Sequence, residues 1–158
     1  LEKYNTWEEI CGKGRIIPAF PGAGGSFEGN ILNAKLTPSI IQATTFGEIN
    51  GGKSERLLQL ASIFKRSYIP YKIEKDMHAW QLCHLAMIVP IADAYYEAGV
   101  PEKAGEDKEL MRKTAITIKK NLDSLHKLGV TLTPKKNESV TQATSTNIGY
   151  WTAFYIPK

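Results

Sequence analysis

The pattern of apolar and polar residues changes its period near residue 52. Upstream of that point, short stretches that alternate or are rich in β-branched residues predict strands over 15–20, 31–36 and 40–46. Downstream, apolar residues recur every three to four positions, which predicts helices over 54–64, 77–98 and 106–128. We therefore expect an α+β fold, with a short β-strand region followed by a mainly α-helical C-terminal domain.

Local signals place the ends of further elements. A capping box over 6–9 predicts a short helix that stops near Gly12 or Gly14. Residues 20–26 have the composition of a glycine-rich loop, and residues 71–74 that of a short strand. Pro90 lies inside the central predicted helix, where it removes a backbone hydrogen bond, so we expect a kink there.

The same pattern divides the chain into three parts. Residues 1–52 carry the strands, and residues 53–133 form the helical domain. Residues 134–158 are rich in Thr, Ser and Asn until an aromatic end, so we expect a polar, partly disordered tail whose aromatic residues need a surface to bury against.

Composition and charge narrow the classes of protein. The chain has 158 residues and is 42% hydrophobic, which suits one globular protein, and it has no apolar run long enough to cross a membrane. Its net charge of +4 is spread thinly, which argues against a nucleic-acid surface. The polar start predicts no secretory signal, and Cys11 and Cys83 are interpreted as buried thiols of a cytoplasmic protein.

A first candidate for chemistry is the segment Gly22-Ala23-Gly24-Gly25. It does not fit the G-x-G-x-x-G fingerprint, because Phe27 stands where the third glycine would be, and a predicted strand follows it rather than a helix. Two interpretations stay open: a tight turn where two backbone segments approach closely, and a backbone wall of a ligand site.

A second candidate lies on the predicted helix 77–98. Met77, Trp80, His84 and Ile88 share one stripe of that helix. A histidine in an apolar stripe is either a satisfied core residue or the proton donor of a pocket, since its reference pKa near 6.5 suits proton transfer. No zinc-ligand spacing and no Ser/His/Asp arrangement is found.

The order of several short segments adds a family resemblance. These segments are Arg15-Ile16-Ile17, Phe20 to Gly25, Thr45-Phe46-Gly47-Glu48-Ile49-Asn50-Gly51, Ser54-Glu55-Arg56-Leu57, the pair Asp76 and Trp80, Pro90, and Leu132-Thr133-Pro134. In this order the chain resembles the ketopantoate reductase (2-dehydropantoate 2-reductase) family over about three quarters of its length.

The resemblance implies an NADPH-dependent oxidoreductase that reduces a 2-oxo acid. Residues 1–52 would then be the terminal β part of a Rossmann-like, dinucleotide-binding domain, and residues 53–133 a helical domain for substrate binding and homodimer formation. Gly22, Ala23, Gly24 and Gly25 would lie near the NADP cofactor. Trp80, Gln81 and Ile88 would line the substrate cleft, and His84 would be the catalytic proton donor.

Two departures from the family bear on activity. The family's nucleotide fingerprint is not in these residues, so we expect a C-terminal fragment that is inactive alone. The family's catalytic lysine aligns with Leu82 or with Gln81, and neither can stabilise a developing oxyanion as a cation does. The alternative is a non-catalytic helical interaction or dimerisation module, whose apolar helix faces bind a second copy.

Overall fold

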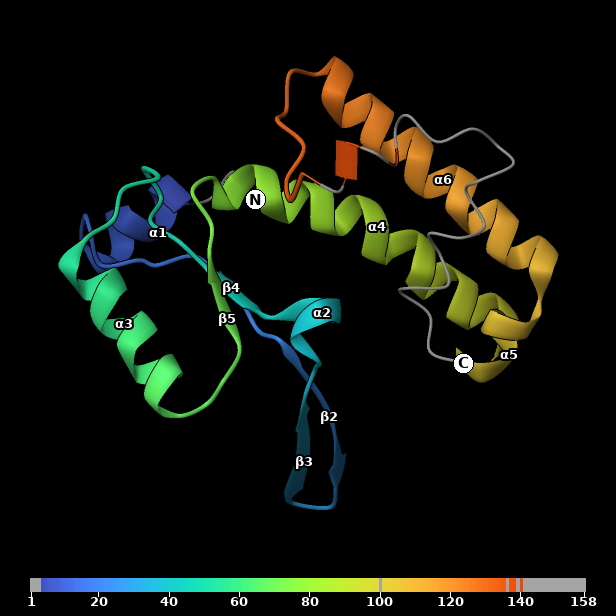
Figure 1. Ribbon diagram of the computed structural model, residues 1–158, viewed down its shortest axis with the longest axis horizontal. Helices are drawn as coiled ribbons and strands as arrows, with labels where there is room; N and C mark the ends of the chain where they lie inside the picture. Colours follow the sequence, from blue (N-terminus) through green and yellow to red (C-terminus); the bar gives the residue numbers. More distant parts are fainter. Residues whose placement is uncertain (1–3, 100, 136, 139, 141–158) are drawn as a thin grey trace. The chain divides into compact units, whose positions relative to one another are not determined.

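The computed structural model describes residues 4–99, 101–135, 137, 138 and 140. It divides into two compact units, Leu1–His78 and Ala79–Lys158, so the division falls after the last strand instead of near residue 52 (Figure 1). The α+β class is confirmed, since helices and small sheets are both present. None of the helices in the described part of the chain is both long enough and apolar enough to cross a bilayer.

The first unit contains a three-stranded sheet in the order β1-β4-β5, formed by Ala19–Phe20, Thr44–Phe46 and Tyr71–Ile73. β1 pairs antiparallel with β4, and β4 pairs parallel with β5. The connection from β4 to β5 runs through α3 (Glu55–Arg66), which makes a β-α-β unit.

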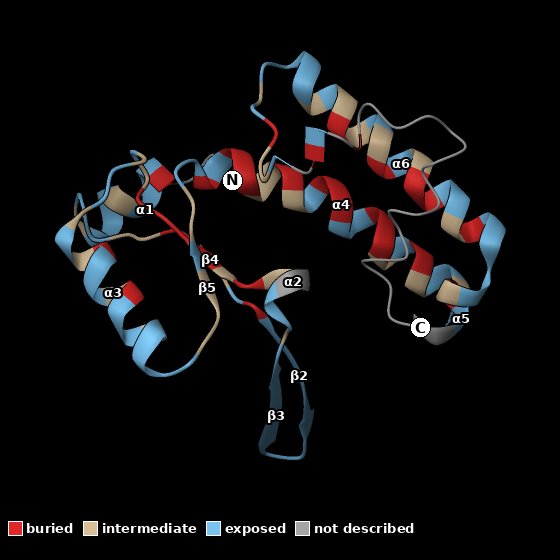
Figure 2. Ribbon diagram, in the orientation of Figure 1, coloured by how far each residue is buried: buried red, intermediate tan, exposed pale blue. Residues whose placement is uncertain are grey.

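Two more strands form a separate hairpin. β2 (Ala23–Glu28) pairs with β3 (Ile31–Leu36) in register Ala23↔Leu36 to Glu28↔Ile31, through a two-residue turn in which Gly29 has φ of 60°. Every residue of both strands is exposed (Figure 2). Because opposed residues share a face, one face carries only apolar or small residues, namely Ala23, Gly25, Phe27, Leu32, Ala34 and Leu36.

The core of the first unit is aromatic. Phe46 of β4 is fully buried and lies 5.3 Å from Phe64 of α3 and 5.7 Å from Tyr71 of β5, measured between ring centroids. Leu57 and Ala61 add the buried aliphatic side of α3. These contacts hold the helix on the sheet.

The second unit is built on two long helices, α4 (Met77–Ala98, which enters this unit at Ala79) and α6 (Lys108–Lys127), joined through the short α5 (Pro101–Glu106). Their shared core contains Cys83, Ala86, Met87 and Ile91 from α4, Ile118 and Leu122 from α6, and Leu132 and Val140 from beyond. The amide of Asn121 also donates to the Ala86 carbonyl at 3.2 Å. The apolar side chains that recur along α6 therefore pack on α4.

The predicted helices are confirmed more closely than the predicted strands. Pro90 lies inside α4, and Ser54 and Asp107 cap α3 and α6. The strand predicted over 40–46 is wrong in its first half, because 39–42 is the short helix α2 (Ser39–Gln42) and only Thr44–Phe46 is extended. The strand predicted over 15–20 is reduced to Ala19–Phe20.

Two further expectations need correction. The capping box at residues 6–9 is wrong, because α1 (Tyr4–Cys11) already includes Thr6. The predicted disordered tail lies largely outside the described residues. Its first part is ordered where described, since Asn137 is 1% exposed and Val140 belongs to the helical core.

Candidate functional site

Gly22 is a packing glycine. Its N–H donates to Thr44 Oγ1 at 2.9 Å, and a Cβ at this position would lie 2.4 Å from the backbone nitrogen of Thr44. Only glycine allows the chain between β1 and β2 to approach β4 this closely. Two interpretations of this segment were left open above. At Gly22 the structure supports the first, in which two backbone segments approach closely.

The next three residues are not in a loop. Ala23, Gly24 and Gly25 belong to β2, so the glycine-rich loop expected over 20–26 is wrong from Ala23 onward. The strand leads into a turn and then into β3, so it does not run directly into a helix as a phosphate-binding loop does. Gly25 is needed because a Cβ would lie 2.5 Å from the Asn33 carbonyl oxygen. These four residues therefore do not fit the phosphates of NADPH.

The stripe on α4 brings together two of its predicted site residues. The rings of Trp80 and His84 are stacked, with centroids 5.0 Å apart and an interplanar angle of 7°. Trp80 is buried and His84 half-buried, and burial lowers the pKa of His84. Near neutral pH the imidazole is therefore uncharged, with one N–H donor and one acceptor nitrogen.

The other two predicted contacts lie further round the same helix. Gln81 is half-buried, and Ile88 is 40% exposed. Together with the Trp80–His84 stack they form a row of one indole, one imidazole, one amide and one aliphatic side chain. We call Trp80, Gln81, His84 and Ile88 the α4 row. It offers neutral hydrogen-bonding groups beside apolar surface, and no charge.

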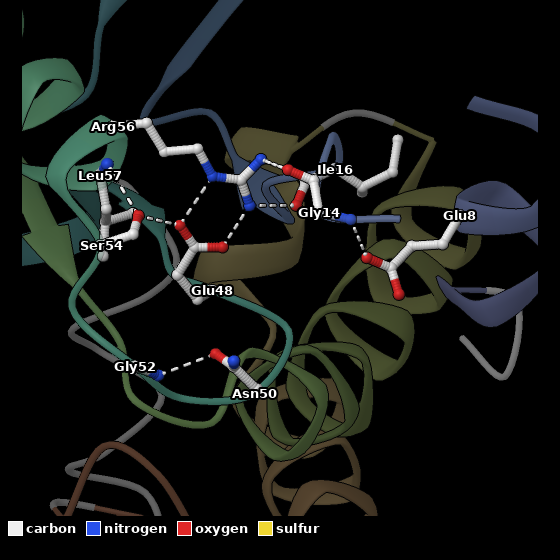
Figure 3. Close-up of polar contacts among 9 residues, drawn as sticks. All are labelled: Glu8, Gly14, Ile16, Glu48, Asn50, Gly52, Ser54, Arg56 and Leu57. Atoms are coloured by element: carbon white, nitrogen blue, oxygen red, sulfur yellow. Dashed lines mark hydrogen bonds and ion pairs between the residues drawn. The ribbon is translucent and has the colours of Figure 1, made fainter. Parts of the chain in front are cut away.

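A third cluster is centred on Arg56 and Glu48, which the sequence did not indicate as candidate site residues (Figure 3). The guanidinium of Arg56 donates to both carboxylate oxygens of Glu48, with 2.9 Å from Nε to Oε1. It also donates to the carbonyl oxygens of Gly14 and Ile16, the latter at 3.1 Å. Ser54 Oγ donates to Glu48 and accepts from Leu57 N at 3.2 Å.

This cluster, which we call the Glu48–Arg56 network, is mainly structural. The Glu48 side chain is only 8% exposed, and the hydrogen bond from Arg56 holds the pKa of that carboxyl below its usual value although burial acts in the opposite direction. Arg56 thereby joins three segments: the chain before β1, the loop after β4 and the first turn of α3. The sequence contained one signal for this network. Segments 45–51 and 54–57, two of those that carry the family resemblance, contain Glu48, Ser54 and Arg56.

The same loop has the spacing G-x-x-x-x-G-K-S from Gly47 to Ser54, between a strand and a helix. A nucleotide-phosphate loop would direct its backbone N–H groups at the phosphates and its last hydroxyl at Mg²⁺. Here Gly51 N donates to the Glu48 carbonyl and Gly52 N donates to Asn50 Oδ1. The Ser54 hydroxyl is engaged, and the Glu48 carboxylate already places a negative charge at the start of α3. In this structure these backbone N–H groups and the Ser54 hydroxyl are engaged within the chain.

The cysteines and potential metal ligands add no further site. Cys83 is buried as expected, but Cys11 is exposed, which corrects the expectation of two buried thiols. Within the described part of the chain, no group of His, Cys, Asp and Glu side chains is arranged to hold a metal ion. Comparison with protein-family models, with curated proteins and with solved structures found no match for this chain.

Proposed function

We propose that the chain is the C-terminal part of a ketopantoate reductase-like, NADPH-dependent oxidoreductase that acts on a 2-oxo acid, and that it is inactive alone. The observation that supports the proposal most is the Glu48–Arg56 network. The two segments that carry the resemblance most fully, 45–51 and 54–57, meet in it through hydrogen bonds among Glu48, Ser54 and Arg56.

The connectivity around this network also supports the proposal. β4, α3 and β5 form a β-α-β unit with parallel strands, the unit from which dinucleotide-binding sheets are built. Because Gly22 to Gly25 do not fit the coenzyme phosphates, NADPH would have to be held by other residues than these. This chain would contribute binding and orientation of the substrate.

The α4 row has the chemistry for that role. His84 would donate a hydrogen bond from the N–H of its neutral imidazole to the oxo oxygen of the substrate, beside the apolar face of Trp80. The Gln81 amide would donate to the substrate carboxylate. Ile88 would contact the aliphatic body of the 2-oxo acid.

The test is direct binding of a 2-oxo acid to the α4 row. The chain has three tryptophans, so the variant Trp7→Phe/Trp151→Phe leaves Trp80 as the only indole. We expect titration with 2-oxo-3-methylbutanoate to change its fluorescence saturably, and His84→Leu to weaken binding about tenfold, as loss of one hydrogen bond does. His126→Leu, at the end of α6, is the matched control.

Two ligands separate recognition of a 2-oxo acid from general anion binding. 3-Methylbutanoate has the same carboxylate and aliphatic body but no oxo group, and we expect it to bind more weakly. Equal responses to both acids, or no saturable response to either, contradict the proposal. Tight binding of NADPH by this chain alone, followed by the coenzyme's own fluorescence, would also contradict it.

The second candidate is the non-catalytic helical interaction or dimerisation module. One observation favours it: α4 has no Asp, Glu, Lys or Arg from Met77 to Ala92, although part of that surface is exposed. The titrations above discriminate the two candidates. The module predicts no selectivity for the oxo group, whereas the reductase predicts it.

A further inference from the structure

The loop between β4 and α3 contains a chemically labile pair of residues, Asn50 and Gly51. The side-chain amide of an asparagine can be attacked by the backbone nitrogen of the residue that follows it, which makes asparagine one of the less durable residues. Glycine in the following position leaves that nitrogen accessible, because it has no Cβ. The sequence contains an asparagine followed by glycine only here.

The fold exposes Asn50 and also requires the glycine after it. The Asn50 side chain is exposed to solvent. Gly51 has φ of 73°, in the left-handed region, and a Cβ at this position would lie 2.7 Å from the carbonyl oxygen of Lys75. No other residue fits at position 51 without strain, so the loop retains the neighbour that makes Asn50 reactive.

The Asn50 carboxamide is turned back over the backbone that follows it. Gly52 N donates to Asn50 Oδ1 at 3.1 Å, which places the side-chain carbonyl in the same turn as the Gly51 nitrogen (Figure 3). When a nucleophile adds to Asn50 Cγ, negative charge develops on Oδ1, and the Gly52 N–H is a donor to that atom. The side chain is thus held near its nucleophile and polarised for attack.

One hydrogen bond of the turn has to open before the reaction. Gly51 N donates to the Glu48 carbonyl oxygen at 3.1 Å, and this nitrogen must be released to attack. Asn50 and Gly52 are both exposed, and local opening of an exposed turn costs little free energy.

We infer that Asn50 is a site of spontaneous deamidation in the folded chain. Gly51 N loses its proton to solvent and forms a bond to Asn50 Cγ. The bond from Cγ to the amide nitrogen then breaks, and that nitrogen takes up a proton from solvent and leaves as ammonia. Water adds to either carbonyl of the resulting succinimide and opens the ring, which leaves aspartate or isoaspartate at position 50.

The modification acts on the Glu48–Arg56 network. Either product places a carboxylate two residues from Glu48, in the same loop, where it repels the buried Glu48 carboxylate. Isoaspartate also adds one carbon to the backbone, which lengthens the turn that Gly51 N closes onto Glu48. We therefore expect the modified chain to hold Glu48 less firmly against Arg56, and to lose protection from amide exchange in α3.

The first experiment is peptide mapping of the folded chain after incubation at mildly alkaline pH. Trypsin releases residues 36–53, in which Asn50 is the only asparagine, and residues 16–35, which contain the exposed Asn30 and Asn33. We expect residues 36–53 to gain one mass unit, since OH replaces NH2, and residues 16–35 to stay unchanged. No gain in residues 36–53, or an equal gain in both peptides, overturns the inference.

The matched variant is Asn50→Gln, whose longer side chain would have to close a larger and less favoured ring. We expect its peptide 36–53 to keep its mass under the same incubation. A gain in this variant overturns the assignment to Asn50, because Gln42 would then be the reacting amide.

The second experiment detects the isoaspartate itself. An isoaspartyl methyltransferase with a labelled methyl donor should label the incubated chain, and should not label the fresh chain or incubated Asn50→Gln. Amide exchange in α3 should be faster in the incubated chain than in the fresh one, and unchanged exchange overturns the effect on the Glu48–Arg56 network. Neither experiment uses a 2-oxo acid, so the outcome does not depend on the proposed reductase function.

Discussion

The two units of the molecule are stabilised by different means. In the first unit, one ion pair between Glu48 and Arg56 joins three chain segments, and a small aromatic cluster holds α3 on the sheet. In the second unit, many aliphatic side chains interlock along α4 and α6, and no described side chain of that shared core is charged. A unit of short strands needs a few directional contacts, whereas two long helices distribute their stability along a stripe.

The difference has consequences for mutation. Removing one partner of a buried ion pair leaves the other charge without compensation, so its cost is concentrated at one residue. Removing one side chain from an aliphatic stripe costs the transfer energy of that side chain and the cavity it leaves. Four predictions follow from this contrast, ordered by the size of the expected effect.

The largest effect is expected for Leu122→Ala in α6, because Leu122 is fully buried between the two helices. Cavity formation should reduce the free energy of unfolding by about 3–5 kcal/mol. Amide hydrogen exchange within α6 measures this loss in the free energy of unfolding locally. Leu128→Ala is the control, since Leu128 is 78% exposed, and a similar loss in both variants would contradict the described core.

Arg56→Met should cost about 2–3 kcal/mol in the first unit. The loss is smaller than for a fully buried pair because the Arg56 side chain is 34% exposed, but Glu48 remains buried and charged. Exchange of the amides in α3 and β4 is the measurement. Arg112→Met breaks an exposed pair with Glu109 and should cost less than about 0.5 kcal/mol.

Acid should weaken the two units over different ranges of pH. The folded pKa of Glu48 is below its unfolded value, so its contribution is present above about pH 4.5 and is lost as the pH falls through the folded pKa. The folded pKa of His84 is also lowered, so the unfolded chain takes up a proton first and stability declines as the pH falls below about 6.5.

The variants Glu48→Gln and His84→Gln separate these two contributions. We would measure the free energy of unfolding by urea at a series of pH values. The decline below about pH 4.5 should be lost in Glu48→Gln only, and the decline below about pH 6.5 should be lost in His84→Gln only. An unchanged pH dependence in either variant would show that another group is responsible.

The smallest effect is expected for Ser54→Ala, which removes the N-cap of α3 and its hydrogen bond to Glu48. Loss of an N-cap typically costs about 1 kcal/mol. Ser62→Ala, at an exposed position within the same helix, should be neutral or slightly stabilising because alanine is the better helix former. Thermal unfolding of the two variants compares them.

Helices were predictable from the sequence where local signals agreed. α3 and α6 combine a clear apolar period with capping residues, and α4 ends at a glycine, so each was placed within a few residues. The strand predicted over 40–46 was wrong in its first half, because β-branched residues suit either a strand or one turn of helix. Only tertiary contacts place α2 there.

The site was predictable in part. The stacking of Trp80 on His84 follows from their spacing of four on one helix, so the sequence placed these two together. The hydrogen bonds from Arg56 to Gly14 and Ile16 join residues about forty positions apart, and no local pattern reports such contacts. The role of Gly22 likewise depends on the backbone of Thr44, which only the fold brings near.

The β2–β3 hairpin has a practical consequence for handling the protein. One face of this hairpin is apolar, and its Phe27 is 74% exposed. This face should retain the chain on a hydrophobic-interaction column. It should also bind a dye such as ANS while the protein is folded. Dye fluorescence would then be a poor assay of misfolding for this protein. Changing Phe27 to threonine should lower that background while keeping the strand, since threonine favours extended backbone.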